Sequence, residues 1–135
     1  MGMQGTGFFT SVALVSAGAA AGAVLRWLLG LGLNTLFPAI PPGTLAANLI
    51  GGYLMGILIA VLAVPSAWGP ELRLLLVTGF LGGLTTFSSF SGEIARLIQA
   101  GRIGMAGLGV GLHVVGSVAL TLAGMATVVL IRRGA

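Results

Sequence analysis

The residues best suited to chemistry gather within one largely apolar stretch, residues 79–93. Its first half combines three glycines with Thr85 and Thr86, and this composition disfavours a continuous helix. We therefore predict a helix break there. If the stretch lies in a membrane, as argued below, the break frees backbone carbonyl groups, which need a partner and are a known means of binding Na⁺. The alternative is an intact helix whose Ser and Thr hydroxyls bond their own backbone.

Two aromatic residues follow the predicted break. Phe87 and Phe90 are three residues apart, so their rings share one face of a helix. Ser88, Ser89 and Ser91 flank them, which indicates that this face meets something polar. Because an aromatic ring has a positive edge, such a pair could favour a small anion without supplying a formal charge.

A second set of polar residues lies near the end of the chain. His113, Ser117 and Thr121 are spaced at i, i+4 and i+8, which places them along one helix face. This stripe predicts either the wall of a hydrated path or a seam between two helices, and the spacing does not separate the two. No acid lies at helical spacing from His113, so a proton relay through this residue is disfavoured.

Two further polar residues interrupt apolar stretches. The Asn48 side chain can donate and accept hydrogen bonds, so it suits either a pore or a bond between helices. Glu93 is the one acid away from an interface. It could act as a gate, as a proton carrier, or as an ion-pair partner for Arg96 at i+3.

The overall composition indicates a membrane environment for all of these residues. The 135 residues are 57% hydrophobic and 6% charged, with a mean hydropathy of +1.14. The charged fraction is far below the roughly 25% that is usual in soluble domains. The low charge and high hydropathy exclude soluble globular folds and disordered chains. A nucleic-acid binder is excluded because the six basic residues are arginines scattered along the chain. The chain has no cysteine, which excludes disulfides and thiolate metal sites.

Four apolar stretches are long enough to cross a bilayer, which takes about 20 residues. We place these spans at about 8–29, 44–64, 71–99 and 102–131, and predict an all-α integral membrane protein with a single four-helix domain over 1–135. Each span carries a Gly-x-x-x-Gly pair, a pattern typical of closely packed membrane helices. The pairs are Gly18/Gly22, Gly52/Gly56, Gly79/Gly83 and Gly107/Gly111. Because four helices enclose little interior, we expect the chain to oligomerise.

The basic residues show no preference for one side of the membrane. With this topology three arginines fall on each side, whereas membrane proteins normally concentrate Lys and Arg in the cytoplasm. The chain could then insert in both orientations and form an antiparallel homodimer. Alternatively, a lipid-facing detail or a chaperone still selects one orientation. The two groups are Arg73, Arg132 and Arg133 on one side, and Arg26, Arg96 and Arg102 on the other.

Two segments and one residue pair resemble the CrcB/Fluc family of fluoride channels. The segments are 82–90 (GGLTTFSSF) and 43–52 (GTLAANLIGG), and the pair is Arg26-Trp27 at the expected end of the first span. Length, span number and the missing charge bias agree, so the resemblance covers essentially the whole chain. Ser89 stands where the family commonly has Thr, and it keeps the hydroxyl group.

The resemblance implies an antiparallel, dual-topology homodimer with two pores in the cell (inner) membrane, through which toxic cytoplasmic fluoride leaves passively. By the same resemblance, Arg26 matches a vestibule cation. The backbone carbonyl groups of Gly82 and Thr85 match the ligands of a structural Na⁺ at the dimer centre. The implied fluoride pathway comprises Phe87, Phe90, Asn48, Ser117, Thr121, His113, Ser88, Ser89 and Glu93.

Other classes of function remain to be weighed against this one. The main alternative is a dual-topology, proton-coupled exporter of small molecules, which would use Glu93 as its carboxylate. A third is an accessory subunit without transport activity. We do not expect an enzyme, because His113 has no apparent catalytic partner in the sequence. The expected partners are fluoride, the lipid bilayer and a second copy of the chain, and no nucleic acid.

Overall fold

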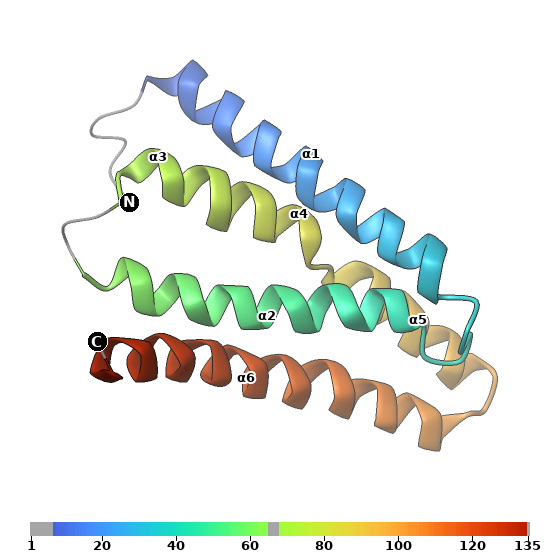
Figure 1. Cartoon of the computed structure of the whole chain (residues 1–135). Helices are drawn as coiled ribbons and strands as arrows, with labels where there is room; N and C mark the ends of the chain where they lie inside the picture. Colours follow the sequence, from blue (N-terminus) through green and yellow to red (C-terminus); the bar gives the residue numbers. More distant parts are fainter. Residues whose placement is uncertain (1–6, 65–67, 135) are drawn as a thin grey trace.

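The computed structural model describes residues 7–64 and 68–134, and all the secondary structure within them is helical. This confirms the prediction of an all-α chain. The helices run back and forth so that the start of α1 and the end of α6 lie at the same end of the molecule (Figure 1). In chain order they are α1 (Phe8–Leu33), α2 (Pro42–Leu62), α3 (Pro70–Arg73), η1 (Leu74–Leu81), α4 (Gly82–Leu84), α5 (Phe87–Gln99) and α6 (Ile103–Gly134).

Four helical segments are long and apolar enough to span a bilayer, as predicted. They are α1, α2, the run from α3 to α5, and α6. The first helix is longer than expected, since it continues to Leu33 rather than ending near residue 29. The pair Arg26-Trp27 therefore lies inside α1 and does not close it. That 1–135 forms a single domain stays a prediction.

The third segment is broken as predicted, at Thr85 and Thr86. Both residues have extended backbones, with φ/ψ of −81/153° and −149/118°. Helix α5 then begins at Phe87, and its first turn is capped by the Thr86 hydroxyl, which accepts a hydrogen bond from the Ser89 N–H at 3.1 Å. The alternative of an intact helix is wrong, because these threonines are extended and one of them caps the next helix.

Glycines allow the helices to approach closely in two pairs. Gly18 and Gly22 of α1 lie against the backbone of η1 and α4, where an added Cβ would overlap carbonyl oxygens. Gly56 of α2 lies in the same way against the Thr121 carbonyl of α6. Three of the four predicted glycine pairs are thus packing sites. The fourth, Gly107/Gly111, has no neighbouring atom within 4 Å of the added Cβ positions.

The packed interior is small, and the outer surface is apolar. The cluster of buried apolar residues in the described helices consists of Ala47, Leu81 and Leu84. Many large apolar side chains are exposed, including Trp27 at 61%. Monomeric proteins in water rarely expose so many large apolar side chains. Together with the four spans, this exposure identifies a multi-pass membrane protein whose outer helix faces lie against lipid or another chain.

Candidate functional site

The candidate site is built around the break, where Asn48 of α2 is bonded to the extended residue Thr86. The Asn48 Oδ1 accepts a hydrogen bond from the Thr86 N–H at 2.7 Å, and the Asn48 Nδ2 donates to the Thr86 carbonyl at 3.0 Å. One side-chain amide thereby satisfies both backbone groups of a residue that has left the helix. Since unpaired backbone groups are costly away from water, this pairing stabilises the break.

Asn48 also determines which ring nitrogen of His113 in α6 carries the proton. Its Nδ2 lies 3.0 Å from the His113 Nδ1. Because Oδ1 is the acceptor from Thr86, Nδ2 is the donor end of the amide, and the His113 Nδ1 must accept. The network thus assigns the ring proton of neutral His113 to Nε2. His113 is only 4% exposed, and its Nε2 has no partner within the described residues.

The two phenylalanines of the sequence motif lie next to this pair. The Phe90 ring stacks on the His113 ring, with centroids 4.6 Å apart and planes at 30°. The Phe87 ring meets Phe90 edge-on at 5.4 Å and 68°. Phe90 is 7% exposed, whereas Phe87 is 77% exposed. The first turn of α5 therefore presents one buried ring and one that projects from the protomer.

Hydroxyl groups of the break region form a connected cluster. The Thr86 Oγ1 lies 3.2 Å from the Oγ atoms of both Ser88 and Ser89. Farther along α5, the Thr44 hydroxyl donates a 2.6 Å hydrogen bond to the Glu93 Oε1. Glu93 forms no ion pair within 4 Å in the described part of the chain, so the proposed bond to Arg96 is not present.

The stripe on α6 is used in part to join α6 to α2. The Thr121 hydroxyl donates to the Gly52 carbonyl of α2 at 3.0 Å and lies 2.9 Å from the Ser117 carbonyl. His113 likewise contacts Asn48 of α2. The spacing left two alternatives open, a hydrated path and a seam between helices, and these contacts favour the seam. That Ser117 and Thr121 also border a hydrated path stays a prediction.

Arg26 occupies a different place from the one expected. Its Nε donates to the Gly83 carbonyl at 3.1 Å, just before the break. Arg26 therefore does not mark the end of the first span, because a carbonyl group near the break gives the guanidinium a partner within the protein. Its role as a vestibule cation stays a prediction.

The break also leaves carbonyl groups without a donor. In the described residues, no hydrogen bond reaches the carbonyl oxygens of Gly82 and Thr85. The Thr86 N–H, which would return to Gly82 in a continuous helix, bonds Asn48 instead. Carbonyl oxygens of this kind are suitable ligands for Na⁺. The donor set thus fits the ion implied by the resemblance.

The structure brings four of the predicted site residues together, while their place in a fluoride pathway stays a prediction. Asn48, His113, Phe87 and Phe90 do lie together. The pairing of Asn48 with the backbone of Thr86 was missed, because the two residues are 38 positions apart and a sequence does not give helix rotation. The contact of Thr44 with Glu93 was missed for the same reason. The position of Thr44 one turn before Asn48 was the available signal.

Comparisons with known proteins identify the family of the chain. A family described as "CrcB-like protein, Camphor Resistance (CrcB)" matches residues 13–125. A protein from Tolumonas auensis named "Fluoride-specific ion channel FluC" is 60% identical over 123 residues, which cover 91% of this chain and 97% of the relative. Proteins of the same name from Pseudomonas syringae pv. maculicola and Desulfovibrio desulfuricans are each 56% identical.

The pairwise matches extend over nearly the full length of both partners. The Pseudomonas match covers 85% of this chain and 91% of the relative, and the Desulfovibrio match covers 90% and 95%. The family match includes every residue discussed at the break, from Asn48 to Thr121. The chain therefore belongs to the CrcB family.

Proposed function

We propose that this chain forms a fluoride-selective ion channel that lets toxic cytoplasmic fluoride leave the cell passively. The observation that carries the proposal is the broken third span. It places the Phe87–Phe90 ring pair beside the amide of Asn48 and the buried ring of His113. Relatives at 56–60% identity bear the name of fluoride-specific channels, which supports the same assignment.

The chemistry of the break suits a small, strongly hydrated anion. A pore for fluoride must replace its water with donors and positive ring edges at close range. The hydroxyls of Ser88 and Ser89, together with the edges of the two phenylalanine rings, are groups of this type. None carries a formal charge, so fluoride is bound weakly enough to be released. A membrane potential that is negative inside then drives the anion outward.

The working channel is an antiparallel homodimer with two pores in the cell (inner) membrane. One protomer leaves Phe87 mostly exposed, and Ser88 and Ser91 on the same helix are exposed as well. Polar groups on a membrane helix normally face a protein partner or water rather than lipid. A second copy of the chain in the opposite orientation supplies that partner and closes the pathway.

A structural Na⁺ at the dimer centre completes this assembly. The carbonyl oxygens of Gly82 and Thr85 would hold it, with the same pair contributed by the second copy. Bound there, the ion would neutralise the partial negative charge of carbonyl groups that the break has freed. We propose no catalytic step, since ion channels are not enzymes.

Growth in fluoride tests the function in cells. A bacterium that lacks its own fluoride channel should regain growth at inhibitory fluoride concentrations when this chain is expressed. The variant Phe87→Ala/Phe90→Ala, detected in the membrane at the same level, should fail to restore it. Absence of rescue by the well-expressed wild-type chain would contradict the proposal.

Replacing Glu93 by Gln separates the channel from a proton-coupled exporter. The Gln side chain keeps an acceptor for the Thr44 hydroxyl but cannot carry a proton between the two sides. We expect passive fluoride efflux from liposomes to persist in this variant. Complete loss of efflux, together with fluoride transport by the wild type that requires a proton gradient, would favour the exporter.

A further inference from the structure

The six arginines of the chain fall into two groups. Three of them donate hydrogen bonds to backbone carbonyl groups near helix ends, where the partial charge is negative. These are Arg26 to Gly83 at 3.1 Å, Arg73 to Leu62 at 2.8 Å, and Arg132 to Ala60 at 3.1 Å. In the described residues, the side chains of the other three form no hydrogen bond and no ion pair, and these are Arg96, Arg102 and Arg133.

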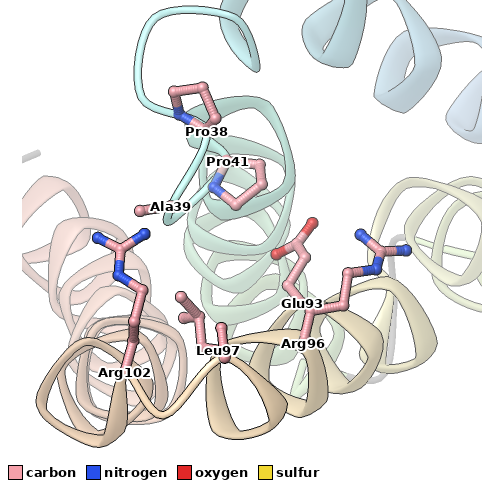
Figure 2. Close-up of a pocket in the computed structure, with 8 residues that line it drawn as sticks. Pro38, Ala39, Pro41, Glu93, Arg96, Leu97 and Arg102 are labelled. Carbon is pink, nitrogen blue, oxygen red and sulfur yellow. The ribbon is translucent and has the colours of Figure 1, made fainter.

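Two of the unpaired arginines line the same pocket. The pocket has a volume of about 260 Å³ and lies between the loop that joins α1 to α2 and the turn that joins α5 to α6. Figure 2 shows Arg102 on one side and Arg96 on the other, with the Glu93 carboxylate beside Arg96. The lining residues are Pro38, Ala39, Pro41, Glu93, Arg96, Leu97, Ala100 and Arg102.

Glu93 does not neutralise the two arginines. Its Oε1 is engaged by the Thr44 hydroxyl at 2.6 Å, and it lies beyond 4 Å from both guanidinium groups. With two guanidinium groups and one carboxylate, the side chains that line the pocket have a formal charge of +1. One of the two arginine charges therefore has no matching carboxylate among the residues that line the pocket.

The position of the pocket indicates which kind of anion could pair with the unmatched arginine. Spanning helices end around it, so the pocket lies at the level of lipid headgroups. The guanidinium fork matches phosphate oxygens closely, and basic pockets between spanning helices bind phospholipid headgroups. The remaining lining is mostly apolar, with Pro38, Pro41 and Leu97 suited to the glycerol region of a lipid.

We propose that this pocket binds the phosphate of an anionic phospholipid headgroup, held by Arg96 and Arg102. The pocket shares Glu93 with the fluoride pathway that the resemblance implies, but the proposal rests on the two arginines, and its test measures lipid binding rather than conduction. An anionic headgroup is favoured over a zwitterionic one by the net positive charge of the lining.

Native mass spectrometry of the full-length, delipidated protein tests the site with defined lipids. Phosphatidylglycerol should bind the wild type, and the variant Arg96→Gln/Arg102→Gln should bind it at least about tenfold more weakly, because two charge-assisted contacts are lost. Arg133→Gln removes an unpaired arginine that does not line the pocket, so its affinity should equal that of the wild type. Arg96→Lys/Arg102→Lys should fall between them, since Lys keeps the charge but not the fork.

Competition with inorganic phosphate separates a lipid from a soluble anion. We expect millimolar phosphate to leave the bound phosphatidylglycerol in place, and phosphatidylcholine to bind more weakly than phosphatidylglycerol. Displacement by phosphate would assign the site to a soluble anion and overturn the lipid proposal. Equal binding by the double variant and the wild type would overturn the site itself. If the double variant is not monodisperse, the two single variants provide the same comparison.

Discussion

Asn48 uses both ends of its amide on one residue of the broken helix and still reaches His113. The sequence predicted that this amide would line a pore or bond to another helix, because an Asn within an apolar span is costly unless it is bonded. It did not predict that the partner would be the Thr86 backbone. Contacts of that kind depend on how two helices are rotated against each other, and one sequence carries no measure of that rotation.

Asn48→Asp tests the donor end of the amide. Asp keeps an acceptor for the Thr86 N–H but cannot donate to the Thr86 carbonyl or to His113. We expect a loss of about 1–3 kcal/mol in stability from the unsatisfied groups, and a loss of most fluoride efflux. Thermal unfolding in detergent and efflux from liposomes measure the two effects.

Asn34→Asp is the matched control for this substitution. The Asn34 Oδ1 also accepts from a backbone N–H, that of Gly43 at 2.8 Å, but Asn34 lies in the loop that follows α1. It should conduct fluoride as the wild type does. Equal losses in the two variants would mean that added negative charge, rather than the missing donor, is responsible.

Phe90 packs against His113 and is also proposed to line the fluoride pathway, and two substitutions can separate these roles. Phe90→Ala leaves a cavity beside His113 and should cost about 3–5 kcal/mol, whereas Phe90→Leu keeps most of the buried volume. Both lose the ring edge, so both should reduce fluoride efflux strongly. Phe8→Leu, at an exposed ring on α1, serves as the control. Wild-type efflux in Phe90→Leu would show that the ring edge is not needed.

The helices themselves were predicted with mixed success, and the physical reasons differ. The break was foreseen because glycines and β-branched threonines weaken a helix wherever it lies. The end of α1 was placed too early, since a charged Arg26 was taken as an interfacial residue. Its bond to the Gly83 carbonyl lets the helix continue to Leu33. A local sequence pattern predicts a local property such as a helix break. It does not show that a charged side chain such as Arg26 has a partner on another helix.

Glycine contacts between α2 and α6 provide a test at this scale. An alanine at Gly56 would place its Cβ against the Thr121 carbonyl, a backbone atom that cannot move aside without displacing α6. We expect Gly56→Ala to lower stability by about 1–3 kcal/mol, as overpacking does. The midpoint of thermal unfolding in detergent measures the change.

Gly107→Ala provides the comparison, because nothing lies within 4 Å of the added Cβ. Within one protomer, this substitution should leave the stability unchanged or raise it slightly, since alanine favours a helix by roughly 1 kcal/mol over glycine. Dissociation of the dimer by Gly107→Ala, detected by size-exclusion chromatography, would instead place Gly107 at the seam between copies. Equal unfolding midpoints for both variants would contradict the close packing at Gly56.

At the scale of the whole molecule, the arginines lie at both ends. Arg73, Arg132 and Arg133 belong to helix segments at the end where α1 begins and α6 ends, while Arg96 and Arg102 lie at the turn between α5 and α6 at the opposite end. Arg26 bonds to a carbonyl group near the break. This distribution remains a weak orientation signal, as the count along the sequence indicated. It is compatible with insertion in both directions, which the proposed antiparallel dimer requires.

A cysteine introduced at one end of the molecule tests dual topology, because the chain contains none of its own. In Gly7→Cys, a membrane-impermeant maleimide added outside intact cells should label about half of the chains, and the rest only after permeabilisation. Adding two lysines after the C-terminus should shift this ratio. Labelling of all chains from one side only would contradict the antiparallel dimer.

Anion efflux from liposomes loaded with KF or KCl is the most direct test of the central claim. The purified protein is reconstituted with Na⁺ present, and valinomycin releases the potassium counter-ion. We predict rapid fluoride efflux without chloride efflux, and strongly reduced fluoride efflux for substitutions at Phe87 and Phe90. An intact, reconstituted protein that releases no fluoride, or that releases chloride equally fast, would contradict a fluoride-selective channel.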